Sequence, residues 1–398
     1  MMEETDLLVV GCGPAGATAA REAARAGIAT IVLDKDATIG AKRVCAAGLR
    51  PGFCEEFDLP RSVVHCDTPR LALFDPDGRE YEVFFGPGHT STREELDGTM
   101  ARLAVTEGAE LRTQMLMREA RAEKDGTIVE YADLRSGERR AIRARSVFFA
   151  QGATAKLERS AFADERWQSG LMTTLQYRVY LDRPAAPIAY RTLELHYYPA
   201  SDGRQIVAWM FPKRDHLAIG LGLTGKLAGQ TLRAELERFT ERVRARLYPD
   251  AQVVRVKEEG HLLYGGWPRA RFADDAVMLG GTAAGLVDAT NGEGIYEAAM
   301  SGRFAAEAVA AHRASPRAAA ALYGRRLHAR FNRRLEHRVR LMRYLESKPA
   351  RYGILFDQLA RSRAFSDALQ REEHERSLRD KLALYANAVR FGVRASFA

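Results

Sequence analysis

Hydrophobic and polar residues change period several times along this chain, and the changes mark its elements. The apolar run at residues 6–10 leads into a glycine and predicts a buried parallel strand. The alanine-rich residues 11–26 predict a helix that Gly27 ends, and residues 28–33 predict a second strand that leads into Asp34. The chain therefore begins as a β-α-β unit.

Alternating patterns, typical of half-buried strands, dominate the middle of the chain. Residues 171–223 are rich in Tyr, Leu and Ile and predict a second, antiparallel sheet. The other predicted elements are a hairpin (70–85), a helix (93–107), a small β-meander (110–149), a helix (230–247), a buried strand (276–279) and a helix (294–311). Beyond Pro316 the pattern is almost entirely helical and is broken at Pro349.

Length and composition restrict the class of protein. A chain of 398 residues, 46% hydrophobic and 28% charged, is long enough for two intertwined globular domains with an appendage. We find no apolar run near the length of a membrane-spanning helix and no secretory leader, so a cytoplasmic location is expected. The four cysteines lie within residues 12–66 and form no CxxC pair, so neither a disulfide framework nor a metal site is expected.

Positive charge is concentrated near the end of the chain. From Arg325 onward there are 18 Lys and Arg against 8 Asp and Glu, whereas the remainder is about neutral. Apolar residues recur there every three or four positions: Leu327, Phe331, Leu335, Val339 and Met342. Such a basic amphipathic helix either lies on anionic lipid, as a peripheral contact at the inner face of a membrane, or packs on its own domain. Nucleic acid is not expected as a partner, because no groove-reading module accompanies the charge.

The segment Gly11-Cys-Gly13-Pro-Ala-Gly16 is a G-x-G-x-x-G between a predicted strand and a predicted helix. The first glycine permits the tight turn, the second lets the backbone approach a pyrophosphate, and the third lets helix and strand pack closely. The free N–H groups of the helix N-terminus attract phosphate. Asp34 lies 23 residues after Gly11, where it can accept hydrogen bonds from an adenosine ribose. The motif therefore predicts a dinucleotide site.

FAD and NAD both fit this motif, and the rest of the chain decides between them. A simple dehydrogenase would continue as a doubly wound sheet. Here the crossover after Leu33 is long and rich in glycine, β-rich insertions follow, and the next strand-glycine-helix unit comes only near residue 280. This layout indicates a flavoprotein whose FAD domain is split by a substrate domain.

The predicted fold is therefore α/β, with three parts. They are a discontinuous Rossmann-type FAD-binding domain (1–70, 90–160 and 255–315), an inserted antiparallel β-sheet substrate-binding domain (71–89 and 161–254) and a helical basic C-terminal region (316–398). The sequence indicates no oligomeric state.

Five segments within about residues 5–312 resemble the geranylgeranyl reductase family, which is similar to the aromatic-hydroxylase group of flavoproteins. The segments are Gly11–Gly16 with Asp34-Lys35, Lys42-Arg-Val-Cys45-Ala-Ala-Gly48-Leu49, Arg93-Glu-Glu-Leu96-Asp97, Ala208-Trp209-Met-Phe211-Pro212-Lys213 with Gly220-Leu-Gly222, and Gly281-Thr-Ala-Ala-Gly285-Leu with Gly292-Glu293-Gly294-Ile295. The cysteine and W-x-F-P-K segments are the more specific ones. The resemblance implies FAD as the cofactor, NADPH or a reduced redox protein as electron donor, and a prenyl-lipid substrate whose isolated C=C bonds are reduced.

The resemblance also implies site residues. The expected cofactor-binding residues are Gly11, Gly13, Pro14, Ala15, Gly16, Asp34, Lys35, Cys45, Ala46, Arg93, Gly152, Gly281, Thr282, Gly292, Gly294 and Ile295. Trp209 and Phe211, on one face of a predicted strand, are expected to form an apolar wall for the prenyl chain. The family normally has Asp where this chain has Thr282, so weaker retention of FAD is expected.

Two residues are candidate catalytic groups. In the family, a cysteine at the position of Cys45 lies at the flavin face, where a thiol can help deliver a proton to the alkene. Lys42 and Arg43 would instead favour the thiolate, so the proton source stays open. Glu293 lies near the start of the helix whose N-terminus would stabilise an anionic reduced flavin.

Two other functions remain open. A flavin monooxygenase or halogenase shares the FAD motifs, although Cys45 argues against it. A non-catalytic flavin-binding or electron-transfer protein is made plausible by Thr282.

Overall fold

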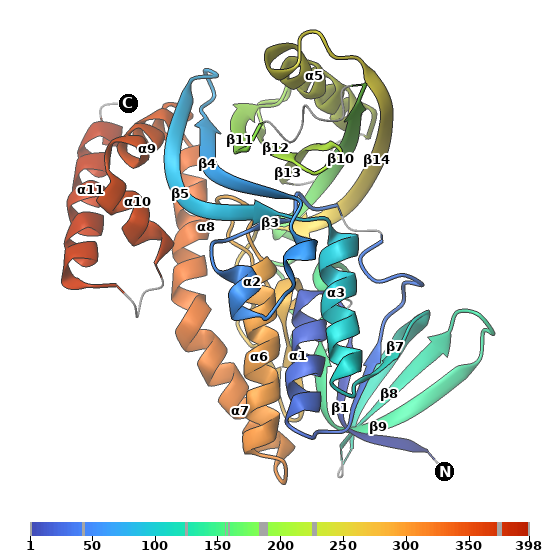
Figure 1. The fold of residues 1–398 in the computed structure, drawn as a ribbon. Coiled ribbons are helices and arrows are strands. Elements are labelled where there is room, and N and C mark those ends of the chain that lie inside the picture. Colours follow the sequence, from blue (N-terminus) through green and yellow to red (C-terminus); the bar gives the residue numbers. More distant parts are fainter. Residues whose placement is uncertain are drawn as a thin grey trace. The chain divides into compact units, whose positions relative to one another are not determined.

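The computed structural model describes residues 2–41, 44–123, 126–155, 157, 160–182, 190–224, 229–371 and 376–396. Lys42 and Arg43, which belong to the cysteine segment, lie outside these residues. The chain forms two compact units (Figure 1). The first unit comprises Met1–Arg43, Arg93–Leu171 and Tyr264–Val339, and the second comprises Val44–Thr92, Met172–Leu263 and Arg340–Ala398.

The first unit is built on a parallel sheet. In the order β16-β9-β1-β2-β6 every neighbouring pair is parallel, and β15 adds an antiparallel edge. The strands are β1 (Glu3–Val10), β2 (Thr30–Leu33), β6 (Glu110–Arg112), β9 (Arg139–Phe149), β15 (Ala273–Asp274) and β16 (Val277–Leu279). The predicted meander is present as β7 (Met115–Glu123) and β8 (Gly126–Asp133), which continue antiparallel from β9.

Helices cover this sheet. In Figure 1, α1 (Pro14–Arg25) lies between α3 (Arg93–Thr106) and α6 (Ile295–Ala311), and it packs against both. Leu7, Leu8 and Val9 of β1 are fully buried, as expected for a strand covered on both faces. Three short 3₁₀ turns belong to the same unit: η2 (Gly152–Thr154), η3 (Gln168–Gly170) and η4 (Gly281–Ala284).

The second unit is built on an eight-stranded sheet of order β14-β10-β13-β12-β11-β4-β5-β3. Its strands are β3 (Gly48–Leu49), β4 (Cys66–Phe74), β5 (Glu80–Thr90), β10 (Leu171–Leu181), β11 (Thr192–Pro199), β12 (Gln205–Pro212), β13 (Leu217–Thr224) and β14 (Val253–Tyr264). Strand β11 pairs in parallel with β4, whereas β10, β13, β12 and β11 pair antiparallel in that order. Two short helical segments, α2 (Phe53–Glu56) and η1 (Arg61–Val63), join β3 to β4.

Helix α5 (Gly229–Leu247) packs on one face of this sheet. Its residues Leu232, Leu236 and Phe239 share a core with Ile206 and Met210 of β12. Because side chains alternate along a strand, Trp209 and Phe211 lie on the opposite face of β12 from this core. The prediction that these two aromatic residues share one face agrees with the alternation.

The units differ from the predicted domain boundaries most at residues 44–70 and in the C-terminal region, and over shorter stretches at residues 90–92, 161–171 and 255–263. Residues 44–70 belong to the second unit, because Gly48 and Leu49 pair with Thr90 and His89 of β5. The C-terminal region is divided, and residues up to Val339 belong to the first unit. Within that part, the Tyr323 hydroxyl donates a hydrogen bond to the Leu279 carbonyl of β16.

The C-terminal region is helical, as predicted. It consists of α7 (Pro316–Leu327), a π-helical turn (His328–Asn332), α8 (Arg333–Glu346), α9 (Ala350–Arg361), α10 (Arg363–Gln370) and α11 (Leu378–Ser396). The apolar residues of the predicted basic helix are at most 8% exposed: Leu327, Phe331, Leu335, Val339 and Met342. That face packs on the protein, so the lipid alternative is wrong for this stretch. Among the helices of the described residues, none combines the length and apolarity needed to cross a bilayer.

Candidate functional site

Four strands of the first unit end at the same level, and each leads into a segment predicted to bind the cofactor. Val10 of β1 is in register with Leu33 of β2 and with Phe149 of β9, and Phe149 is in register with Leu279 of β16. Gly11, Asp34, Gly152 and Gly281 follow these strand ends within three residues. Ligands of open parallel sheets bind outside the carboxyl ends of the strands. This edge is therefore the candidate functional site.

In the first glycine loop the backbone segments lie too close together for a side chain at Gly11 or Gly16. Gly11 has a φ of +99°, and a Cβ at this position would lie 2.4 Å from the Ala150 carbonyl oxygen. A Cβ at Gly16 would lie 1.8 Å from the Gly11 carbonyl oxygen, so helix α1 can pack on this turn only without a side chain there. The helix begins at Pro14, and no side chain caps it at Gly13. Its first N–H groups are thus available to a phosphate.

The Asp34 carboxylate is fixed at the end of β2. It is 3% exposed, and its two oxygens accept hydrogen bonds from the N–H groups of Cys12 (2.7 Å) and Asp36 (2.9 Å). A carboxylate has about four lone-pair positions, so Asp34 can also accept bonds from a ribose. Lys35 beside it is exposed to solvent.

Arg93 at the start of α3 lies against the glycine loop. Its Nε and one terminal nitrogen donate to the two Asp97 oxygens at 2.9 and 2.7 Å, and Asp97 is fully buried. A Cβ at Gly13 would lie 3.6 Å from the Arg93 guanidinium and 3.9 Å from Asp97. The bidentate pair therefore holds a positive group beside the loop that is predicted to bind the pyrophosphate.

The second glycine motif lies beside the first. Gly281 has a φ of +55°, and a Cβ there would lie 3.3 Å from the Ala15 side chain of α1. Gly302 of α6 comes even closer, because a Cβ there would lie 2.2 Å from the Ala15 carbonyl oxygen. Both contacts are made at the first turn of α1. The two segments thus adjoin, although about 270 residues separate them in the chain.

The loop that carries Gly292 is ordered by Asp288. The Asp288 carboxylate accepts bonds from the N–H and the hydroxyl of Thr290 and forms an ion pair of 3.0 Å with Arg338 of α8. The Asp288 N–H donates to the Glu293 carbonyl. Gly292 has a φ of +75° with open space where a side chain would be. Glu293 lies in this loop and not in the helix, because α6 begins two residues later at Ile295.

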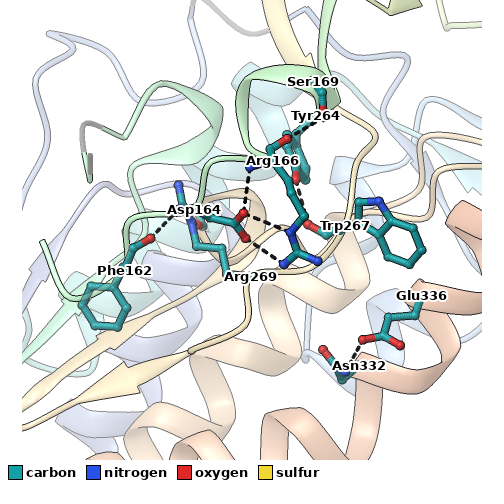
Figure 2. A network of polar contacts seen from close by, with 10 residues as sticks. Phe162, Asp164, Arg166, Ser169, Tyr264, Trp267, Arg269, Asn332 and Glu336 are labelled. Atoms are coloured by element: carbon teal, nitrogen blue, oxygen red, sulfur yellow. Dashed lines mark hydrogen bonds and ion pairs between the residues drawn. The ribbon is translucent and has the colours of Figure 1, made fainter. Parts of the chain in front are cut away.

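The buried Arg269 binds the η4 turn through Ala283, and Figure 2 shows it beside its second partner, Phe162. Arg269, 3% exposed, donates from Nε to the Ala283 carbonyl (2.8 Å) and from a terminal nitrogen to the Phe162 carbonyl (2.6 Å). Its guanidinium lies 3.9 Å from the centre of the Trp167 ring, which stacks on Tyr264. The sequence interpretation missed Arg269, since a lone arginine in a loop follows no period or motif.

The predicted catalytic cysteine lies in the second unit, in the irregular segment before β3. Cys45 is half-buried, and its Sγ accepts the N–H of Ala47 at 3.3 Å. Ala47 has a φ of +46°, which is uncommon for alanine, and its carbonyl accepts the Ser91 N–H. The half-buried Ala46 presents its carbonyl to the ammonium group of Lys213.

Lys213 is the second residue that the sequence interpretation left without a role. It is 1% exposed, and no carboxylate in the described part of the chain forms an ion pair with it. Burial lowers the pKa of Lys213 to about 7. The nearby thiols of Cys45 and Cys66 act in the opposite direction and raise this pKa. Burial likewise raises the pKa of Cys66. The segment that carries Cys45 is thus hydrogen-bonded, through the Ala46 carbonyl, to an amine whose charge can change near neutral pH.

Glycines make room for both predicted wall residues. Trp209 of β12 is in register with Gly220 of β13, and a Cβ at Gly220 would lie 2.4 Å from the indole ring. The indole Nε1 donates to Gln176 Oε1 at 2.9 Å. Likewise, a Cβ at Gly48 would lie 2.7 Å from the Phe211 ring. The glycine after the W-x-F-P-K segment is therefore a packing partner of its tryptophan.

The predicted site residues fall into two groups. Cys45, Ala46, Trp209 and Phe211 belong to the second unit. The first unit holds Gly11, Gly13, Pro14, Ala15, Gly16, Asp34, Lys35, Arg93, Gly152, Gly281, Thr282, Gly292, Glu293, Gly294 and Ile295. No cluster of side chains suited to a metal ion occurs among the residues that the structure describes.

Several known proteins are similar to this chain. Residues 4–51 match a family model described as an FAD binding domain. A digeranylgeranylglycerophospholipid reductase of Methanosphaerula palustris is 28% identical over 77% of this chain and 76% of its own length. A geranylgeranyl bacteriochlorophyll reductase-like protein of Thermoplasma acidophilum shares the fold, with a TM-score of 0.71, 22% identity, and coverage of 100% of this chain and 99% of its own. A flavin-dependent brominase has a TM-score of 0.72 at 17% identity, covering 98% and 99% of the two chains.

Proposed function

We propose that this chain is a geranylgeranyl reductase-type, FAD-dependent oxidoreductase that reduces isolated C=C bonds of a prenyl chain. Reductases of geranylgeranyl compounds are 27–28% identical to it over about three quarters of its length, and residues 4–51 match an FAD binding domain. The observation that carries the proposal is the common level of four strand ends, with both glycine motifs placed against the first turn of α1. When bound, FAD supplies the hydride at its N5 atom.

The first unit holds the cofactor. The uncapped N–H groups after Gly13 donate hydrogen bonds to the pyrophosphate. The Asp34 carboxylate accepts hydrogen bonds from the hydroxyls of the adenosine ribose. The Arg93 guanidinium places positive charge beside the loop. The isoalloxazine ring of FAD would lie against the open backbone at Gly292. The positive end of the α6 dipole, at Gly294 and Ile295, would stabilise the negative charge of the reduced flavin. Glu293 contributes through its backbone, since its carbonyl closes the loop onto Asp288.

Cys45 delivers the proton in this proposal. Reduction of an alkene adds a hydride to one carbon and a proton to the other, and a neutral thiol can provide the proton. The thiolate left behind is stabilised by the charged form of Lys213, which bonds the neighbouring Ala46 carbonyl, and solvent then returns the proton. Trp209 and Phe211, on the same face of β12, are proposed to form the apolar wall for the prenyl chain, with the half-buried Phe211 in contact with it.

The finer assignments are part of the same proposal. NADPH or a reduced redox protein provides the electrons. The protein works in the cytoplasm and meets its lipid substrate peripherally, at the inner face of a membrane. The M. palustris relative, which is named for a glycerophospholipid substrate, supports this assignment.

Product mass tests the proposed activity. The FAD-loaded protein would be incubated with dithionite and geranylgeranyl diphosphate, with protein lacking FAD as the control. We expect products that have gained two hydrogen atoms for each bond reduced. Unchanged substrate with fully loaded protein, for this compound and for a geranylgeranylated glycerophospholipid, would contradict the proposal.

A flavin monooxygenase or halogenase is the second candidate, favoured by the likeness of fold to the brominase. Substrate-dependent oxygen consumption would support it. Recovery of the purified protein without stoichiometric flavin would instead favour a non-catalytic role, in line with Thr282.

A further inference from the structure

Helix α11 (Leu378–Ser396) carries five large apolar side chains on the face exposed to solvent. The exposed fractions are 74% for Leu378, 60% for Leu382, 72% for Tyr385, 49% for Val389 and 57% for Val393. Their spacing of three or four residues places them within about 80° of the helix circumference. We call these five residues the α11 stripe.

The opposite face of α11 attaches the helix to its own unit. It combines the half-buried Leu384 and Phe391, whose ring contacts Tyr344 of α8, with polar or small residues. Asp380, Asn387 and Ala395 are at most 6% exposed. Asp380 accepts hydrogen bonds from Ser377 and pairs with Arg371, while α9 and α10 pack against α11 (Figure 1). A surface helix normally buries its apolar stripe and exposes its polar face. Helix α11 has apolar side chains on both faces, and those of the stripe are exposed and therefore available to an external partner.

Cations flank the α11 stripe on both sides. By helical position, Lys381 lies on one flank and Arg379 and Arg390 on the other, and all three are exposed. Asp380 is the single acidic residue of α11, and it is buried and bonded. The exposed surface of the helix thus combines apolar groups with positive charge. A second copy of this surface would bring like charges together, whereas an anionic surface complements it.

We propose that the α11 stripe binds an anionic lipid surface, with α11 lying in the plane of the interface. Apolar side chains enter the boundary between headgroups and acyl chains, Tyr385 lies at headgroup depth, and the flanking cations contact phosphates. This assignment gives the membrane contact of the proposed function a definite surface. It differs from the sequence expectation, which concerned residues 325–343.

Sedimentation with lipid vesicles tests the proposal. Purified protein would be mixed with vesicles of phosphatidylcholine, or of phosphatidylcholine with phosphatidylglycerol, and then pelleted. We expect binding to the anionic vesicles, and at least about tenfold weaker binding by the Leu382→Glu/Val389→Glu variant. Val105→Glu is the matched control, because Val105 is a helical valine of similar exposure (48%) in α3 of the other unit.

Three outcomes would overturn the proposal. The protein could stay in the supernatant with both kinds of vesicle, or Leu382→Glu/Val389→Glu could pellet as well as Val105→Glu. The wild type could also sediment as a dimer that this variant turns into a monomer, which would make the stripe a contact between copies. Prenyl reduction by the same variants in detergent solution is measured in parallel, so that a failure of the lipid surface is distinguished from a failure of the proposed activity.

Discussion

At the scale of single residues, Gly220 sets the position of Trp209. An added methyl group would lie 2.4 Å from the indole, so the ring must move and its bond to Gln176 must weaken. We predict that Gly220→Ala lowers the free energy of unfolding by about 1–3 kcal/mol. Gly260→Ala, in β14 of the same sheet, meets atoms no closer than 3.6 Å and is the control. Urea unfolding that gives equal midpoints for both variants would contradict the assigned packing.

Cys45 is the proton donor in the proposed reaction. We predict that Cys45→Ala slows reoxidation of reduced flavin by a prenyl substrate by about a hundredfold or more, which is the usual contribution of a general acid. Flavin content should stay that of the wild type. Cys54→Ala removes a buried thiol of the same unit and should change neither quantity. Anaerobic stopped-flow absorbance measures the rate, and an unchanged rate in Cys45→Ala would remove this residue from the mechanism.

Lys213 makes the stability of the protein depend on pH. Its pKa is about 7 when folded, against an ordinary value of 10.5. Below about pH 7, Lys213 is protonated in both the folded and the unfolded protein, so the folded protein bears the full cost of a buried charge. Between about pH 7 and 10.5 only the unfolded protein keeps this proton, so the free energy of unfolding rises with pH.

Lys213→Met removes this titration. We predict that the variant is more stable than the wild type by a few kcal/mol at about pH 6, and that the advantage shrinks toward zero above about pH 10. Urea midpoints of both proteins at each pH measure the difference. An advantage independent of pH would show that the amine does not titrate in this range.

At the scale of elements, the η4 turn depends on a side chain outside it. Arg269 bonds the carbonyls of Ala283 and Phe162, and its removal leaves both without this donor. We predict that Arg269→Met weakens flavin binding by about tenfold or more, since bonds to a charged donor contribute about 1.5–3 kcal/mol each. Arg271→Met is the control, because Arg271 is exposed and pairs with Asp274. Flavin titration of the two apoproteins makes the comparison, and equal affinities would refute the bracing role.

Elements with a strong local pattern could be predicted from the sequence, and those that depend on distant pairing could not. The β-α-β start, the hairpin, α5 and α6 follow their hydrophobic periods closely. Residues 44–70 were misplaced because β3 and β4 join the second sheet through β5, which no local pattern records. The glycine loops were recognisable by motif, whereas Arg269 and Lys213 act through contacts that form only in the folded chain.

At the scale of the whole molecule, arginines of the basic C-terminal region form ion pairs within the protein. Arg334 pairs with Glu297 of α6, and Arg338 pairs with Asp288 in the loop that carries Gly292. Both carboxylates are at most 5% exposed, so these arginines neutralise charges that could not otherwise be buried. Two of the arginines that suggested a membrane surface therefore serve internal ion pairs, and the exposed cations beside the α11 stripe remain for that role.

In the proposed function, this chain passes hydride from its flavin to a prenyl alkene. Anaerobic photoreduction of the FAD-loaded protein, followed by mixing with a geranylgeranyl compound in the absence of oxygen, tests it most directly. We predict that the oxidised flavin absorbance returns and that the compound gains two hydrogen atoms per bond. Flavin that stays reduced with every prenyl compound and reoxidises only when oxygen is admitted would contradict the account.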